Sequence, residues 1–132
     1  MIFKVGDNFL HEFILSKDIY NGFLDTFKDK NPMHVNYNFA LDHGYSDIVM
    51  HGNILNGFIS YFIGELLPAK NVVILSQEIK FNNPVYLNDT LSFYGTIFEI
   101  YESVGVINFN YKFINQKNNT VAKGRIQIKK IK

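Results

Sequence analysis

An aspartate and a histidine stand five positions apart in the segment "DKNPMHVN", residues 29–36, with a proline between them. A carboxylate and an imidazole can each take up or release a proton, so together they could activate a water molecule by general acid–base catalysis. The same segment is also good turn sequence, because Asp and Asn side chains bond nearby amides and proline presets φ. Taken alone, the segment favours the structural interpretation.

A second polar segment, "VMHGN" at residues 49–53, shifts the balance toward catalysis. It precedes a long apolar stretch, and the first amides of a helix are unsatisfied donors that suit a developing negative charge. Gly52 has no side chain to block a carbonyl from its N–H. His51 either lines this loop or caps it. Ser60, about two turns further along, either faces the same site or bonds to its own helix.

The N-terminal elements are expected to lead directly into the 29–36 segment. Residues 9–16 alternate as a strand does, with Phe9 and Phe13 on one face. Ser16 is a good N-cap for an amphipathic helix over 17–27. Pro32 excludes a continuing helix, so irregular backbone is expected there.

Two further helices are expected before residue 71, after which the spacing of the apolar residues changes. A short helix covers 37–43 and ends at Gly44. Residues 52–67 are apolar almost all round, which is typical of a buried helix, and Pro68 ends it.

After residue 71 the apolar residues recur with period two. Strands are expected over 72–81, 90–101, 104–114 and 121–132, with a hairpin turn at 115–119. Residues 107, 109, 111 and 113 should share the buried face. The pattern predicts an α+β domain in which an antiparallel sheet wraps one long central helix. Its unpaired edge strand suggests a dimer.

Composition limits the function classes. The 132 residues fit a single domain over 1–132, and the formal charge of +1 gives no reason to expect nucleic-acid or membrane partners. The absence of cysteine excludes disulfides, thiolate nucleophiles and cysteine-rich metal sites. No apolar run is long enough for a signal sequence or a membrane span, so a cytoplasmic location is expected.

These segments together resemble the MaoC-like (R)-specific enoyl-CoA hydratases, the hydratase 2 family. "DKNPMHVN" is similar to that family's Asp-x-Asn-Pro-hydrophobic-His-x-Asp/Asn motif. "GYSDIVMHG", "GFISYFIGELLP" and "QEIKFNNPVYLNDTL" resemble the family's approach to its His-Gly, its central helix and the following strand. The resemblance spans about residues 4–100, and the C-terminal strands agree in pattern only.

The resemblance implies a hot-dog fold, a homodimer and a site layout. Asp29 and His34 match the family's catalytic pair, and Gly52 matches its oxyanion-hole glycine. Asn31 matches a loop-supporting Asn and Ser60 the helix serine, with His51 a further supporting candidate. No metal or redox cofactor is implied, since coenzyme A or phosphopantetheine enters as the carrier of the substrate.

The implied activity is that of a hydro-lyase, adding water to a trans-2-enoyl-CoA or removing it from an (R)-3-hydroxyacyl thioester. The acid and base roles of Asp29 and His34 stay open, as do the physiological direction and any assembly above the dimer. Bulky Phe58, Phe62 and Ile63 favour a short acyl chain. Asn53 stands where the family tends to have an apolar residue, and Lys28 and Lys30 flank Asp29.

Three other functions remain open. The substrate could be linked to an acyl carrier protein in a biosynthetic pathway. The chain could be a hot-dog protein that binds acyl thioesters without catalysis. A thioesterase is less favoured, because it has no specific need for an Asp-x-Asn-Pro-x-His loop.

Overall fold

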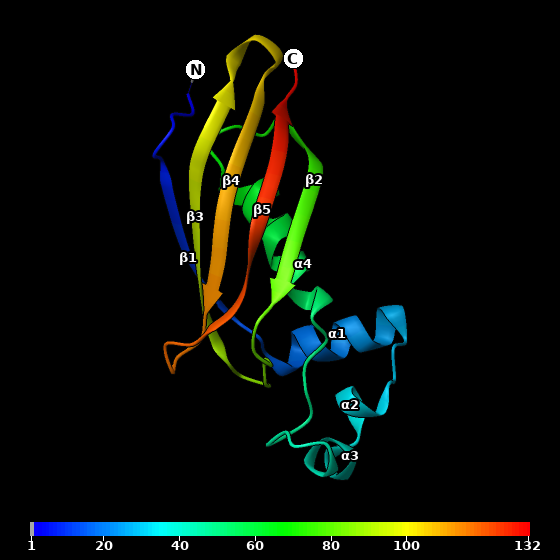
Figure 1. Ribbon diagram of the computed structural model, residues 1–132. Coiled ribbons are helices and arrows are strands. Elements are labelled where there is room, and N and C mark those ends of the chain that lie inside the picture. The colour runs from blue at the N-terminus through cyan, green and yellow to red at the C-terminus, as the bar shows by residue number, and fades with distance from the viewer. Residues whose placement is uncertain (1) are drawn as a thin grey trace.

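The computed structural model describes residues 2–132 as one sheet with a helix behind it and three helices at one end (Figure 1). The five strands are β1 (Asn8–Ile14), β2 (Val72–Phe81), β3 (Thr90–Tyr101), β4 (Val106–Ile114) and β5 (Thr120–Lys130). The α-helices are α1 (Lys17–Phe27), α2 (Pro32–Val35), α3 (Tyr37–Asp42) and α4 (Asn53–Tyr61). A π-helical turn, Phe62–Leu66, extends α4, and a 3-10 turn, Glu102–Val104, joins β3 to β4.

All strand pairs in the sheet are antiparallel, in the order β1-β3-β4-β5-β2. The strands predicted from the sequence are therefore confirmed, and β1 and β2 form the two edges. Bulges interrupt the registers of β2 and β3 between Ile74 and Ser76 and between Ile97 and Glu99. Such bulges increase the local twist and help the sheet curl around α4. None of the described helices is long and apolar enough to cross a membrane.

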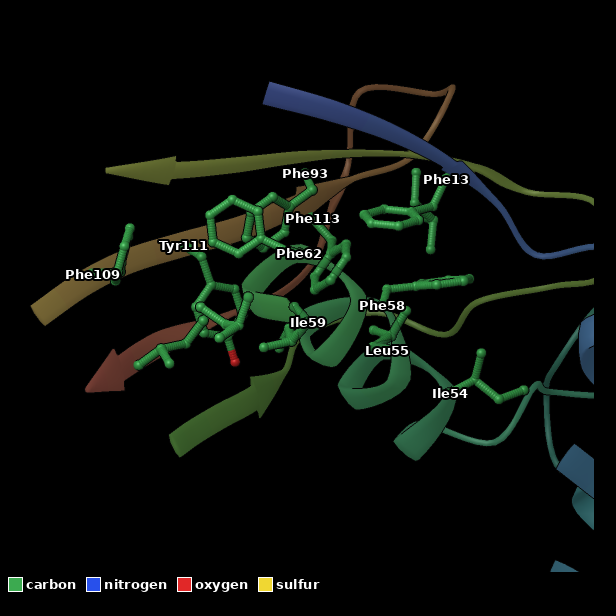
Figure 2. Close-up of a cluster of buried hydrophobic side chains, with 14 of the residues drawn as sticks. Phe13, Ile54, Leu55, Phe58, Ile59, Phe62, Phe93, Phe109, Tyr111 and Phe113 are labelled. Atoms are coloured by element: carbon green, nitrogen blue, oxygen red, sulfur yellow. The ribbon is translucent and has the colours of Figure 1, made fainter. Parts of the chain in front are cut away.

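The core lies between α4 and the concave face of the sheet. Figure 2 shows Phe58 of α4 and Phe62 of the π-helical turn facing aromatic side chains of the strands. Phe13 stacks on Phe58 with ring centroids 4.5 Å apart, and Phe62 lies 4.6 Å from Phe93. The four alternating residues of β4 predicted to point inward, Ile107, Phe109, Tyr111 and Phe113, are all buried.

Helix α4 differs from the prediction in two respects. It was expected to be buried nearly all round, but Asn53, Gly57 and Ser60 form an exposed stripe along one side. This stripe lies on the side away from the sheet, where this chain has no further layer to cover it. In addition, the last part of the predicted helix is the π-helical turn, and the extended backbone at Leu67, with ψ 152°, ends it before Pro68.

Helix α1 begins and ends as the sequence predicts. The Ser16 hydroxyl accepts a hydrogen bond from the Ile19 N–H at 3.3 Å, and Lys28, with φ 60°, ends the helix in the left-handed region. The helix has no fully buried residue, although Phe23 packs against the core. Its apolar face therefore remains available to line a groove.

The 29–36 segment is more regular than expected. Asn31 has extended backbone (ψ 136°), as its position before proline requires. Pro32, however, occupies the first position of a single helical turn, where its missing N–H costs nothing. The Asn31 side chain caps this turn by accepting from the Met33 N–H at 3.0 Å. The expectation of wholly irregular backbone was therefore wrong.

Candidate active site

Asp29 and His34 lie next to each other at the mouth of a cleft. The Asp29 Oδ2 atom is 3.7 Å from His34 Nε2, and the Asp29 Oδ1 atom accepts from the Asn31 N–H at 3.1 Å. The first distance is too long for a direct hydrogen bond, but one water molecule can contact both atoms. The α2 turn thus brings together the two side chains that sequence reasoning singled out.

The His34 ring is fixed by a main-chain carbonyl. Its Nδ1 atom is 2.7 Å from the Val49 carbonyl oxygen, which can only accept, so Nδ1 carries the proton. In the neutral ring, Nε2 is then an unprotonated acceptor facing Asp29. When the ring is protonated, Nε2–H faces the carboxylate instead. Either state places the functional nitrogen toward the cleft.

His51 lies directly behind the pair. Only 3% of its surface is exposed, its ring centroid is 3.9 Å from that of His34, and its Nε2–H donates to the Asp29 carbonyl at 2.8 Å. Phe23 covers the ring further out, at 4.8 Å. His51 Nδ1 is buried without a hydrogen-bond partner among the described residues. The residue therefore supports the loop that carries the pair.

Tyr20 of α1 is a supporting residue that sequence reasoning missed. Its hydroxyl donates to the His34 carbonyl at 2.6 Å, so the loop is held at both ends of its 29–34 stretch. Burial raises the pKa of Tyr20, which keeps the hydroxyl a donor. The only sequence signal was its place on the α1 face that also carries Phe23 and Phe27, and this signal points equally to packing.

A cleft of about 490 Å³ separates this loop from the connection that follows β2, and we call it the loop cleft. Asp29, His34 and Gly52 line one side, and residues 81–85 line the other. The Gly52 N–H has no acceptor among residues 2–132, and Gly52 precedes the first turn of α4. A Cβ atom on Gly52 would lie 2.9 Å from the Phe81 ring, so any other residue here requires that half-exposed ring to move.

A second, larger depression of about 830 Å³ lies between α1 and α4, and we call it the α1–α4 groove. Its walls are mostly apolar, with Phe23 and Phe27 on one side and Ile54 and Phe58 on the other. Asp29 and Asn53 line both depressions and form the ridge between them. Asp29 therefore lies between a cleft with mixed polar and apolar walls and a mostly apolar groove.

Two expectations about the surroundings of the pair are not met. Phe58, Phe62 and Ile63 were expected to shorten an acyl pocket, but only Phe58 lines the α1–α4 groove, and Phe62 and Ile63 are buried in the core and line neither depression. A carboxylate that acts as a base is expected to be desolvated, yet half of the Asp29 side chain (51%) is exposed in this chain. Desolvation must therefore come from bound substrate or from another surface.

Ser60 lies apart from the pair in this chain. It is exposed on the α4 stripe and lines neither the loop cleft nor the α1–α4 groove. No hydrogen bond links its hydroxyl to the described part of its own helix. Neither interpretation of Ser60 is therefore supported by this chain's contacts, and its substrate role stays a prediction.

Asp29, His34 and His51 together offer three donor atoms within 4.8 Å of one another, which is a possible metal-ligand set. Two features argue against this use. His51 Nε2 is already bonded to the Asp29 carbonyl. The His34 and His51 rings also lie face to face at a 31° angle, so their in-plane lone pairs do not converge well on one point. The arrangement suits a water molecule better than a metal ion.

Comparison with known proteins gives a consistent result. Residues 7–117 match the family model described as MaoC like domain. An (R)-specific enoyl-CoA hydratase from Rhodospirillum rubrum is 35% identical over 79 residues, covering 60% of this chain and 54% of that protein. A 3-hydroxybutyryl-CoA dehydratase from Methylorubrum extorquens is 34% identical over 80 residues, covering 58% and 51%. The matches thus span about half the length of these relatives.

Among solved structures, the (R)-hydratase from Aeromonas caviae involved in PHA biosynthesis superposes with a TM-score of 0.87. It is 21% identical, and the alignment covers 96% of each chain. The likeness confirms the hot-dog fold that the sequence predicted. Because the family model matches most of this chain, residues 7–117, the chain belongs to the MaoC-like domain family.

Proposed function

We propose that this chain is a hydro-lyase that adds water to trans-2-enoyl thioesters and, in reverse, dehydrates (R)-3-hydroxyacyl thioesters. The observation that carries the proposal is the 3.7 Å approach of Asp29 Oδ2 and His34 Nε2 beside the open Gly52 amide. The relatives named as an enoyl-CoA hydratase and a 3-hydroxybutyryl-CoA dehydratase support the same chemistry.

The proton balance of hydration defines what the pair must do. Water forms a bond from its oxygen to C3 of the enoyl group, while C2 gains a proton. Asp29 and His34 therefore share one proton between them before the reaction, give it to C2, and regain one from the attacking water. Because each cycle restores the starting state, no net proton is consumed. Which of the two groups gives the proton stays open.

Charge accumulates on the thioester carbonyl oxygen as water adds to C3. The Gly52 N–H and the positive end of α4 would stabilise that charge, which is the usual task of an oxyanion hole. The thioester would lie in the loop cleft, and the acyl chain would pass the Asp29–Asn53 ridge into the α1–α4 groove. Of the three residues expected to shorten the pocket, only Phe58 lines this groove, whereas Phe62 and Ile63 are in the core.

Several accompanying features are proposals of the same kind. Coenzyme A or the phosphopantetheine of an acyl carrier protein would carry the acyl group, and the reaction needs no metal or redox cofactor. A homodimer would cover the exposed α4 stripe, and could supply the desolvation that Asp29 lacks. The cytoplasmic location remains a prediction.

The direct test is hydration of crotonyl-CoA, followed by loss of the absorbance of the conjugated double bond. We expect turnover by the purified protein, and a loss of about 10²-fold or more in kcat for Asp29→Asn and for His34→Ala, since positioned acid–base groups contribute that much. Both variants should stay folded by circular dichroism, because neither side chain is part of the core.

Matched controls are available at the C-terminal end of α3, where Asp42→Asn and His43→Ala make the same changes at exposed positions. Both should keep full activity. Undiminished turnover by Asp29→Asn would exclude its catalytic role. Release of free thiol from a saturated acyl-CoA would support a thioesterase instead, and turnover confined to carrier-protein substrates would identify the carrier.

A further inference from the structure

Three side chains beside the proposed site form a directed chain of hydrogen bonds. The Gln77 side-chain amide of β2 donates to the Asn56 carbonyl oxygen Oδ1, and Asn56 Nδ2 donates to Asn53 Oδ1 at 2.8 Å. The amide oxygens of Asn56 and Asn53 are thus each occupied by the donor before it. The series ends at Asn53, whose amide is oriented with Oδ1 toward Asn56.

With Oδ1 of Asn53 engaged, the group left over is its Nδ2 donor. No acceptor for Nδ2 is present among residues 2–132. A terminal amide that could rotate freely would offer either an oxygen or an N–H to a ligand. Here Oδ1 is engaged by Asn56, so the N–H is the group that Asn53 presents.

The position of Asn53 places this donor beside the path of the substrate. Asn53 directly follows Gly52, and with Asp29 it lines both the loop cleft and the α1–α4 groove. If the thioester carbonyl meets Gly52 and water adds near Asp29, the carbons just beyond C3 pass Asn53 on their way into the groove. Asn56 and Thr26 also line this groove, among otherwise apolar residues.

We propose that Asn53 is a specificity-determining residue, and that the preferred substrate is an enoyl thioester whose acyl chain carries an oxygen acceptor on carbon 4 or 5. The inference rests on the proposed hydration activity. A plain alkyl chain would strip water from the Asn53 N–H without replacing its hydrogen bond, whereas a hydroxyl or carbonyl oxygen would replace it. Sites that bind a substrate oxygen in this way discriminate against the analogue that lacks it.

The test compares hex-2-enoyl-CoA with its 4-hydroxy and 5-hydroxy derivatives, which differ from it by one oxygen. We expect wild-type kcat/KM to be at least about tenfold higher for one of the hydroxylated substrates, within the range that a substrate hydrogen bond contributes. Asn53→Leu, of similar size but without a donor, should lower that ratio to about one or below. Asn110→Leu, the same change at an exposed site on β4, should leave the ratio unchanged.

The ratio separates this inference from the activity on which it rests. Turnover of all three substrates with the same kcat/KM, or a ratio that Asn53→Leu does not alter, overturns the role of Asn53 and leaves the hydratase proposal standing. Absence of turnover of all three, and of crotonyl-CoA, overturns the hydratase proposal and this inference with it. Asn56→Ala, which removes the donor to Asn53 Oδ1, should give an intermediate ratio.

Discussion

Main-chain carbonyl groups hold the candidate catalytic pair at the level of single residues. The His34 ring donates to the Val49 carbonyl, while His51 and Tyr20 donate to the Asp29 and His34 carbonyls. Carbonyl oxygens only accept, so each contact also fixes which atom of its partner bears the proton. The geometry of the pair thus depends on side chains that need not touch the substrate.

His51 is one of these supports, and its role can be tested by substitution. His51→Leu removes the N–H that holds the Asp29 carbonyl, so we expect kcat with crotonyl-CoA to fall by about 10- to 100-fold, since displacements near 1 Å have effects of that size. KM should change by less than about threefold, because the residue does not face the thioester. Steady-state kinetics on protein of confirmed folded fraction give both values.

The conservative variant His51→Gln distinguishes positioning from simple packing. Its side-chain N–H can reach the same carbonyl, so it should recover most of the lost kcat although it fills the ring's volume poorly. If His51→Leu and His51→Gln lose the same activity, or if kcat per folded molecule is unchanged in both, His51 serves only to pack against Phe23 and His34.

Some residues of the candidate site could be identified from the sequence and others could not, depending on how unusual each residue is in its local pattern. Asp29, His34 and Gly52 were found because their chemistry and spacing are unusual together. Tyr20 was not, because an aromatic residue on an apolar helix face has a packing explanation that needs no site. Ser60 was placed by helical spacing and by its match to the family's helix serine, and neither shows what lies opposite that face of the helix.

At the scale of elements, one side chain links three strands. The Tyr111 hydroxyl on β4 donates to the Glu78 carbonyl of β2 at 2.7 Å, crossing over Gly124 of the intervening β5. A Cβ atom on Gly124 would come within 1.9 Å of that carbonyl oxygen. The glycine inside an otherwise regular strand therefore marks the place where this hydroxyl must pass.

This link predicts an alkaline limit to stability. Burial, and to a lesser degree the Glu78 carboxylate, raises the pKa of Tyr111 above its usual value in the folded state. The contribution of the Tyr111 hydroxyl to the free energy of unfolding is therefore fully present below the unfolded-state pKa of about 10. This contribution is lost as the pH rises above that value. The free energy of unfolding should fall above about pH 10, and less steeply in Tyr111→Phe.

Urea unfolding at pH 8 and at pH 10.5 measures both effects. At pH 8, Tyr111→Phe should cost about 1–2 kcal/mol, because it leaves the Glu78 carbonyl without its donor. Tyr94→Phe, at an exposed position of β3, is the matched control. It should change neither the free energy of unfolding at pH 8 nor its decrease between pH 8 and pH 10.5. If the free energy of unfolding falls equally with pH in the wild type and in Tyr111→Phe, the pKa of this hydroxyl does not differ between the folded and unfolded states.

Local signals predicted most of the elements, and tertiary contacts decided the remainder. The Ser16 cap and the alternation in β4 are each contained in a short run of sequence. Pro32 was misjudged because proline stops one helix and starts another with equal ease. The π-helical turn at Phe62–Leu66 was missed because its residues have the same apolar pattern as an α-helix, and packing against the sheet selects between them.

At the scale of the whole molecule, the two edges of the sheet are unequal. Edge strand β2 has ten residues, and Val73, Ile74 and Leu75 on it are 39–49% exposed. Edge strand β1 has seven residues. A long, apolar, unpaired edge favours association with another strand. We therefore expect the proposed homodimer to form through β2, beside the exposed stripe of α4.

Lysine on an edge strand opposes such pairing, which makes the expectation testable. Light scattering coupled to size exclusion should give about twice the 15.3 kDa chain mass for the wild type, and the chain mass itself for the double variant Val73→Lys/Leu75→Lys. Leu10→Lys places the same charge on β1, at a side chain 69% exposed, and should remain dimeric. A dimer that survives both β2 lysines, or that Leu10→Lys dissociates, would assign the interface to another surface. If dissociation also lowers hydration of crotonyl-CoA without unfolding the chain, the partner supplies the cover that half-exposed Asp29 lacks within one chain.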